Sequence, residues 1–537
     1  MYHGAGADWQ DAQVPPIRPA ALVLAGLLAL GACSGNGPTI STGGPSGTPT
    51  GTATATPTAS PTAGSTPSAV VTVPPATSPA TPSRGVLSAW KGCGSGFECA
   101  TLTVAMDDSK PALGTVGLAL TRHRATGHNR VGSLLVDPGG PGASAVDFAK
   151  DAYTILPATV RQHFDIVAFD PRGVGHTAPV RCGTTSELDA FFAIDPDPDD
   201  AKELAALDNG NRKLAAGCER RSARILPYVS TSVAAQDMDR VRQAVGDAKL
   251  TYLGYSYGTS LGAAYLEQFP TRVRAMVLDG AVDPALTWDQ LLAGQAGGFD
   301  GALRSFLADC EKTRCAFRTA VSGDLGQAYD RLAASVDRSP LPTGGRTSLG
   351  PSEFTYGVAD GLYSKNLWPA IARGLAEVAH GQGQTLLALN DDFFRRTSAG
   401  YENLFEALNA VTCIDQPWPR SVGPYQALAD RVARTAPRFG RVIALSLACI
   451  SWPVRPVSTP HRITAPGMPP VLVIGTSRDP ATPFAWARSL AGQLSRGILV
   501  THDGDGHTAY RSSSPACLQD PVNAYLVSLR VPAPFTC

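Results

Sequence analysis

The sequence has little that indicates a metal, a nucleic acid or a membrane span. It contains no C-x-x-C and no H-E-x-x-H spacing, so we expect no metal site and no other cofactor. Its 45 basic and 45 acidic residues give a formal net charge of zero, and no basic patch predicts a nucleic-acid partner. The apolar run at residues 20–32 is about a dozen residues long, which is too short to cross a bilayer.

That apolar run has the length of the hydrophobic region of a secretory signal peptide. It ends in L-G-A-C at Cys33, which resembles the lipobox of bacterial lipoproteins, where the cysteine is diacylated and becomes the N-terminus. We therefore expect residues 1–33 to be a lipoprotein signal peptide and a lipid on Cys33 to be the only membrane contact. Ordinary cleavage after Ala32 is the alternative. In either case the protein is exported, to the cell membrane surface or into the cell envelope.

Residues 34–85 have the composition of a disordered tether. They are almost wholly glycine, serine, threonine, proline and alanine, and their first charged residue is Arg84. Such a segment has too little apolar surface to fold. We expect it to hold a folded body, which begins near residue 86, away from the membrane.

Cysteines indicate how this body is cross-linked. Eleven occur in the chain, and setting Cys33 aside leaves an even set, which predicts disulfides in an exported protein. Short loops close at the least entropic cost, so we expect neighbours along the sequence to pair. The expected pairs are Cys93–Cys99, Cys182–Cys218, Cys310–Cys315, Cys413–Cys449 and Cys517–Cys537.

Short apolar runs alternate with helical patterns, which predicts a mostly parallel sheet with helices on both faces. An antiparallel hairpin opens the body, at residues 99–106 and 115–123. Between about 285 and 465, long helical stretches replace the strand pattern. Further strands are expected at 133–136, 164–169, 250–253, 273–278, 470–475 and 497–501.

The stretch 251–259 has the pattern of a strand that turns sharply at a serine and continues as a helix. Gly254 and Gly258 flank Ser256, because side chains at those positions would collide in so tight a turn. This is the G-x-S-x-G pattern, in which a strained turn exposes a nucleophilic serine. A second match centres on Ser260, which would lie one turn into the helix. We interpret Ser256, at the strand-to-helix junction, as the nucleophile.

A glycine-rich loop, D-P-G-G-P-G at residues 137–142, follows an earlier strand. In such a loop, glycines let the backbone approach a substrate and offer an N–H to an oxyanion. The alternative is a dinucleotide fingerprint, G-x-G-x-x-A at 140–145, with Asp170 ending the next strand. Because Pro141 lacks an N–H and an exported protein has little access to a nicotinamide cofactor, we favour the oxyanion interpretation.

A nucleophilic serine needs a general base, and the base needs a carboxylate that orients it. Asp479 follows a late strand, although aspartate before proline and threonine is also a good helix N-cap. His507 lies in the glycine-rich loop after the last strand, whereas His502 would lie at the end of that strand. We expect Ser256, Asp479 and His507 to act together in acyl transfer.

Serine, aspartate, histidine is the chain order of α/β-hydrolases. The expected fold class is therefore α/β, specifically the α/β-hydrolase fold. The long stretch between Ser256 and Asp479 requires an insertion before the strand that leads to the aspartate. We expect a core of residues 86–284 and 466–537 and a large, mainly helical cap of residues 285–465.

Six motifs, in order along the chain, resemble those of one family. P-G-G-P-G, D-P-R-G-V-G, L-G-Y-S-Y-G-T, L-D-G-x-x-D-P, D-P-A-T-P and G-H-T together resemble the actinobacterial tripeptidyl aminopeptidase family. These are exported α/β-hydrolases related to proline iminopeptidases, and the family includes mycobacterial envelope serine proteases. Where proline iminopeptidases carry a histidine before Gly-Gly-Pro-Gly, this chain has Asp137-Pro138.

The resemblance implies that Ser256 is the nucleophile, with Asp479 and His507 as its partners. It also implies that the N–H groups of Gly140 and Tyr257 form the oxyanion hole. The implied activity is removal of short peptides from free N-termini. We expect a monomer that acts on a peptide or small acyl substrate without a cofactor.

An exopeptidase must hold the α-ammonium group of its substrate at a fixed distance from the serine, so the cap needs a carboxylate. Asp415 and Glu402 are the candidates, although both could be solvated surface charges. A carboxylesterase or lipase and an endoprotease would use the same triad, so these alternatives stay open. A hydrolase-fold binding protein or a structural wall protein would not need the triad.

Overall fold

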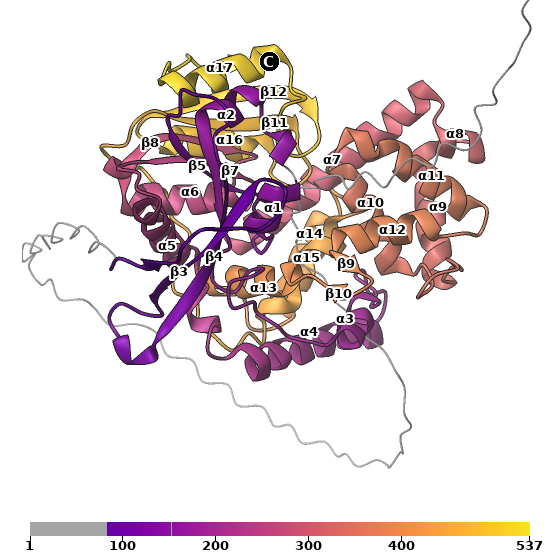
Figure 1. The fold of residues 1–537 in the computed structure, drawn as a ribbon. Helices are drawn as coiled ribbons and strands as arrows, with labels where there is room; N and C mark the ends of the chain where they lie inside the picture. The colour runs from indigo at the N-terminus through magenta and orange to yellow at the C-terminus, as the bar shows by residue number, and fades with distance from the viewer. Residues whose placement is uncertain (1–82, 152) are drawn as a thin grey trace, which may run out of the picture. The chain divides into compact units, whose positions relative to one another are not determined.

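A computed structural model describes residues 83–151 and 153–537 of the chain. The expected signal peptide, Cys33 and most of the expected tether lie outside these residues. The described part forms an 11-stranded sheet in the order β1-β3-β4-β6-β5-β7-β8-β11-β12-β13, with β2 beside β3 (Figure 1). The strands are β1 (Val86–Leu87), β2 (Lys91–Gly92), β3 (Phe97–Ala105), β4 (Thr115–His123), β5 (Gly132–Asp137), β6 (Phe164–Phe169), β7 (Leu250–Tyr255), β8 (Val273–Asp279), β11 (Val471–Arg478), β12 (Gly497–Asp505) and β13 (Phe535–Thr536).

The sheet is mostly parallel, as predicted. From β6 through β5, β7, β8, β11 and β12 to β13, every neighbouring pair is parallel. The expected opening hairpin is also confirmed, because β3 pairs antiparallel with β4 and β4 pairs antiparallel with β6. The carboxyl ends of the parallel strands share one edge of the sheet, where ligands bind in folds of this kind.

Two apolar cores lie on opposite faces of the sheet, because successive side chains of a strand point to opposite faces. In β7, Tyr252 belongs to one core, whereas Leu253 and Tyr255 belong to the other. Helices cover both faces, as predicted. The first core includes residues of α5 (Thr231–Ala244), α6 (Tyr257–Gln268) and α16 (Phe484–Gln493), and the second includes residues of α1 (Ala145–Asp151), α2 (Ala158–His163) and α17 (Ala516–Ser528).

A large helical insertion lies between β8 and β11, where the sequence predicts the cap. Leu472 of β11 pairs with Val277 of β8, so the chain leaves the sheet and re-enters it at one place. Its helices are α7 (Trp288–Thr313), α8 (Ala316–Ala320), α9 (Leu325–Arg338), α10 (Pro351–Leu362), α11 (Trp368–Ala379), α12 (Gln384–Phe393), α13 (Leu404–Asp415), α14 (Gly423–Val432) and α15 (Gly440–Ala444), with a small hairpin of β9 (Arg396–Thr397) and β10 (Gly400–Tyr401).

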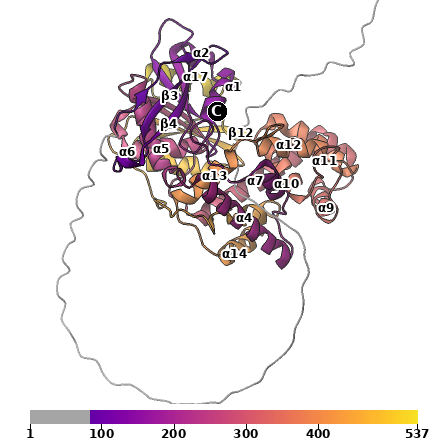
Figure 2. The ribbon, with the colours of Figure 1, turned by 60° about the horizontal axis from the view of Figure 1, so that its bottom comes forward.

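Two helices from an earlier part of the chain pack on this insertion. The helix α3 (Thr185–Phe192) contacts β10, and α4 (Ala201–Ser222) contacts residues 447–449. Figure 2 shows α4 beside α13 and α14. The region around the insertion is therefore built from two separate stretches of sequence.

The cysteines of the described residues are joined in the pairs expected from their order. Over residues 83–151 and 153–537, no helix has both the length and the apolar character needed to cross a membrane. Within the same ranges, no group of three or more histidine, cysteine, aspartate or glutamate side chains is arranged to hold a metal ion.

Arg172 ties the loop after β6 to the helical layer beneath it. Its side chain is 2% exposed and donates to both carboxylate oxygens of Asp237 in α5, at 2.6 and 3.1 Å. It also donates to the carbonyl oxygens of Ala105, the last residue of β3, and of Met106. Removing one partner of a buried ion pair leaves the other charge uncompensated.

We expect Arg172→Ala to lower the free energy of unfolding by about 1–3 kcal/mol, because Asp237 would lose two of its hydrogen bonds in a buried site but keep its ion pair with Arg240 at 2.7 Å. Denaturant unfolding measures this loss. Arg212→Ala is the control, since the Arg212 side chain is 54% exposed and its pair with Asp208 lies at the surface, where such pairs contribute about 0.3–0.5 kcal/mol. Equal, small losses in both variants would contradict the anchoring role of Arg172.

Candidate active site

Ser256 lies where β7 ends and α6 begins, in a backbone conformation that few residues adopt. Its φ is +56° and its ψ is −123°, and its N–H donates to the carbonyl oxygen of Asp279 at 2.8 Å. A Cβ on Gly254 would collide with the carbonyl oxygen of Gly258. Such strain persists only where the surroundings enforce it, and it is common at functional sites.

His507 and Asp479 form a buried hydrogen-bonded pair. The Nδ1 atom of His507 lies 2.9 Å from both carboxylate oxygens of Asp479, so Nδ1 carries the proton and Nε2 keeps its lone pair. Asp479 also accepts the N–H groups of Ala481 and Thr482 and the hydroxyl of Thr482. Both side chains of the pair are 0% exposed. The carboxylate is therefore fixed from several sides and orients the imidazole.

Two atoms of this group are buried without a hydrogen-bond partner among the described residues. They are Oγ of Ser256 and Nε2 of His507. A buried polar atom without a partner costs free energy and is uncommon in native proteins. Each atom is therefore available to a group of a bound reactant.

Two residues that the sequence analysis did not identify hold the loop of His507. Asp279, at the end of β8, accepts the N–H groups of Ala509 and Tyr510, and burial raises its pKa to about 6. From the insertion, the carbonyl oxygen of Tyr363 accepts the N–H of His507 at 2.8 Å, and the Tyr363 ring meets the imidazole edge-on. Asp279 lies in the L-D-G-x-x-D-P motif, which could have identified it.

The glycine-rich loop meets the start of α6 beside Ser256. Gly139, Gly140 and Gly142 have φ values of +96°, +112° and +106°, a region that favours glycine. A Cβ on Gly139 would come within 2.9 Å of the Tyr257 nitrogen. Tyr257 is the first residue of α6, so its N–H has no acceptor within the helix and is suited to an anion.

The dinucleotide alternative requires a carboxylate that is free to bind a ribose. Asp170 is 0% exposed. Its oxygens accept the hydroxyl of Ser144 and the N–H groups of Val146 and His176, and burial raises its pKa. Asp170 is thus occupied inside the core, which does not fit nucleotide recognition.

A cavity of about 230 Å³ lies beside the glycine-rich loop and Tyr257. Gly140, Pro141 and Tyr257 line it, together with one face of α6, the far end of α13 and the segment from Val457 to Ile463. Much of its wall is apolar. Leucine and valine side chains that contribute to it include Val282, Leu286, Leu291, Leu408, Val411 and Val457.

The charged side chains of the cavity are mostly acidic. Glu267, Asp283 and Asp415 are among the described residues that line it, and these include neither lysine nor arginine. Glu267 pairs with His461, whose Nε2 lies 2.7 Å from a carboxylate oxygen. Asp283 accepts the side-chain amide of Gln493. The cavity is therefore suited to a cation rather than an anion.

The two acidic residues expected to bind an ammonium group lie in different places. Asp415, the last residue of α13, lines the cavity and accepts the N–H of Thr231 at 2.9 Å and the hydroxyl of Thr231. Burial raises the pKa of Asp415 to about 6, and no lysine, arginine or histidine of the described residues pairs with it. Glu402 is exposed, precedes α13 and is not part of the cavity lining.

The alternative serine and histidine are separate from the Asp479–His507 pair. Ser260 lies one turn into α6 and lines the cavity. His502 lies within β12 rather than at its end, because β12 continues to Asp505, which pairs with Arg478 of β11. The sequence therefore predicted this strand too short.

Comparison with known proteins agrees with the fold. Residues 132–511 match the α/β hydrolase fold family. Serine protease Hip1 of Mycobacterium tuberculosis is 38% identical over 481 residues, which cover 84% of this chain and 91% of that protein. Carboxylesterase B of the same species is 38% identical over 448 residues, which cover 81% and 85%. Tripeptidyl aminopeptidase of Streptomyces lividans is 31% identical over 460 residues, which cover 83% and 85%.

The parallel sheet, the turn at Ser256 and the family match define an α/β-hydrolase. More narrowly, the chain belongs to the actinobacterial α/β-hydrolase family that includes these relatives, and the resemblance read from its motifs is confirmed.

Proposed function

We propose that this chain is an exported serine peptidase that removes short peptides from the free N-termini of its substrates. The observation that carries the proposal is the buried pair of His507 and Asp479 near a cavity lined by acidic side chains. In this pair, Nε2 of His507 has no hydrogen-bond partner among the described residues, and the same is true of Oγ of Ser256. The relatives named serine protease and tripeptidyl aminopeptidase support the same activity.

The mechanism is acyl transfer. His507 Nε2 accepts the proton of Ser256 as Oγ attacks the scissile carbonyl carbon, and the N–H groups of Gly140 and Tyr257 hold the resulting oxyanion. His507 then gives its proton to the leaving amine, and a water molecule releases the acyl group by the same steps in reverse. A single oxyanion donor contributes roughly 3–4 kcal/mol to such a reaction.

The dimensions of the cavity support a short peptide as substrate. Its lining follows α6 from Tyr257 to Gln268, a distance of about 16 Å at the rise of an α-helix. Three extended residues span about 10 Å. A tripeptidyl group bound through Ser256 would therefore fit alongside α6.

Asp415 is the proposed partner of the substrate's ammonium group. Its carboxylate bonds only to Thr231 among the described residues, so a cation in the cavity would supply its missing ionic partner. Burying an unpaired charge costs several kcal/mol, and the bound ammonium would remove this cost for both groups. Glu402, being exposed outside the cavity, is not proposed for this role.

The first test concerns the nucleophile. Ser256→Ala should abolish both hydrolysis and labelling by a serine-reactive phosphonate, because no other oxygen would be in place to attack. Ser260→Ala, one turn further along α6, should still be labelled. Full phosphonate labelling of the Ser256→Ala protein, measured by intact mass, would reject the mechanism.

The second test concerns Asp415 and pH. The pKa of Asp415 is raised to about 6, so the carboxylate is ionised only above that value and loses its charge as the pH falls through it. The ratio of kcat/KM for a free tripeptidyl amide to that for its N-acetylated form should therefore fall below about pH 6. Taking the ratio cancels the titration of groups that serve both substrates.

Asp415→Asn should lower kcat/KM for the free tripeptidyl amide by about tenfold or more, roughly 1.4 kcal/mol per decade, and should remove the pH dependence of the ratio. Glu267→Gln is the matched control, since Glu267 lines the same cavity but is paired with His461. Equal turnover of free and acetylated substrates at every pH would replace the aminopeptidase with an endopeptidase or an esterase.

A carboxylesterase is the second candidate, favoured by the relative named carboxylesterase B and by the apolar part of the cavity wall. Esters and amides share the acyl-enzyme step, and esters are intrinsically easier to cleave. Ester hydrolysis alone would therefore not argue against a peptidase. The acetylation experiment separates the two, because an esterase has no use for an ammonium partner.

For location, we propose that a lipid on Cys33 attaches the protein to the outer face of the cell membrane, as the L-G-A-C sequence suggests. Cys33→Ala should then release the protein or leave an unprocessed precursor, because no other residue offers the acylation site. Cell fractionation and mass spectrometry of the mature N-terminus measure this. An unmodified mature N-terminus in the wild-type protein would reject lipidation.

A further inference from the structure

The first turn of α13 forms the outer wall of the glycine-rich loop. A Cβ on Gly142 would collide with the carbonyl oxygen of Leu404 and would lie 3.0 Å from the Leu408 nitrogen. A Cβ on Gly140 would lie 3.4 Å from the Leu404 side chain. The backbone of the glycine-rich loop therefore packs directly on the backbone of α13. As a result, the position of α13 determines where the N–H of Gly140 lies.

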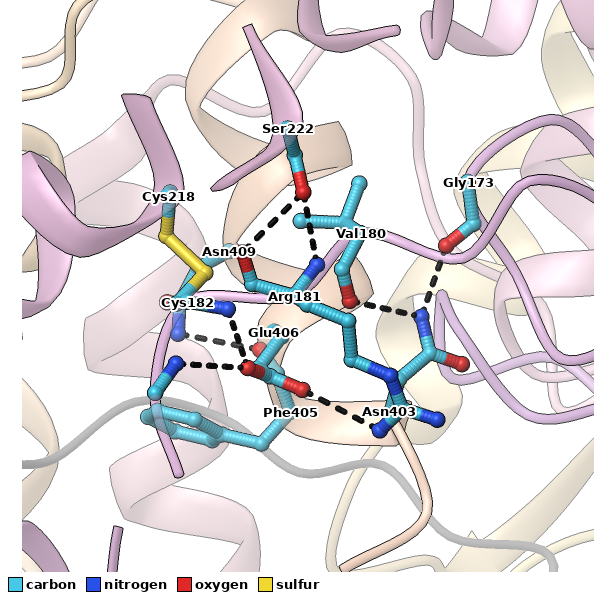
Figure 3. The surroundings of a disulfide bond; sticks show 11 residues. Gly173, Val180, Arg181, Cys182, Cys218, Ser222, Asn403, Phe405, Glu406 and Asn409 are labelled. Atoms are coloured by element: carbon cyan, nitrogen blue, oxygen red, sulfur yellow. Dashed lines mark hydrogen bonds and ion pairs between the residues drawn. A yellow bond between two sulfur atoms is a disulfide. The ribbon is translucent and has the colours of Figure 1, made fainter. Parts of the chain in front are cut away.

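The start of α13 is fixed in turn by the segment that follows β6. Asn403, 3% exposed, donates to the carbonyl oxygens of Gly173 and Val180 (Figure 3). Its side-chain oxygen accepts the N–H of Gly175. Both polar atoms of the Asn403 side-chain amide therefore bond to the segment between Gly173 and Val180. Asn403 thus sets where α13 begins.

Glu406, one turn further on, holds the same segment through two hydrogen bonds from the backbone. Its side chain is 1% exposed, and its Oε1 accepts the N–H groups of Cys182 and Gly183 (Figure 3). Its other oxygen lies 3.6 Å from the guanidinium of Arg181. Cys182 is itself joined to Cys218 of α4, so Glu406 binds a part of the backbone that is already cross-linked.

We propose that Glu406 is a positioning residue for catalysis: by fixing the first turn of α13 against the Cys182 segment, it holds the glycine-rich loop in the place where Gly140 stabilises the oxyanion. This inference rests on the proposed acyl-transfer function. Glu406 touches neither the substrate nor the reacting atoms, and its effect passes through Leu404 to Gly140 and Gly142.

The expected signature is a loss of kcat rather than of binding. The oxyanion exists only along the reaction path, so a displaced donor weakens the transition state and leaves ground-state binding largely unchanged. Misplacement by about 1 Å can reduce a rate about 100-fold. Asp415, at the opposite end of α13, keeps its bonds to Thr231 and with them the proposed ammonium site.

The test compares Glu406→Ala, Glu406→Gln and Glu377→Ala in the full chain with a free tripeptidyl amide. Glu406→Ala should lower kcat by about 10- to 100-fold with KM changed less than about threefold, and should slow phosphonate labelling of Ser256 to a similar degree. Glu406→Gln keeps an oxygen that accepts the two N–H groups, so it should restore kcat to within about fivefold of the wild type.

Glu377→Ala is matched because Glu377 of α11 also accepts a backbone N–H and a hydroxyl, both from Thr385, away from the glycine-rich loop. Its kcat should equal that of the wild type. If Glu406→Ala does not fold, Glu406→Asp replaces it, since the shorter side chain keeps the carboxylate but changes the spacing between α13 and the Cys182 segment. A smaller fall in kcat, again with little change in KM, is then expected. Thermal unfolding reports on folding in each variant.

The inference is overturned if Glu406→Ala keeps wild-type kcat, if its defect lies in KM, or if Glu406→Gln is as impaired as Glu406→Ala. These outcomes are distinct from failure of the proposed function, which would appear as full activity or labelling in Ser256→Ala.

Discussion

The strained backbone at Ser256 is the constraint on which the rest of the site depends. A positive φ at a serine persists only if neighbouring segments hold it, and the close approach of Gly254 to Gly258 shows how little room is left. The same turn brings the start of α6 against the loop that follows β5, so position 139 in that loop must also be glycine. The turn thus restricts the conformation of the loop, and the loop in turn restricts where α13 can pack.

The inserted helices therefore contact the proposed active centre from two directions. Tyr363 holds the backbone and ring of His507, while Leu404 packs on the glycine-rich loop. Together with the complete burial of Ser256, these contacts give the proposed reacting groups little exposure to solvent. In such surroundings, electrostatic interactions are stronger than they would be in water.

Much of this arrangement could be predicted because its signals are local. The strand at 164–169 is apolar throughout and is bounded by turn residues, and β6 has those limits. The place of Ser256 followed from one nine-residue stretch. Tyr363 could not be found in this way, because its contact with His507 joins distant parts of the chain. Nor could the sequence separate Asp415 from Glu402, two acids near opposite ends of α13, since only the packing decides which end faces the cavity.

The order of the elements along the chain has a consequence for synthesis. Domains generally fold from the N-terminal side as the chain emerges, and here β7 and α6 are complete long before β11 and β12. A partly made chain contains the serine and its turn but neither the histidine nor the aspartate, because the whole helical insertion separates them. The proposed triad is thus complete only when the last strands join the sheet.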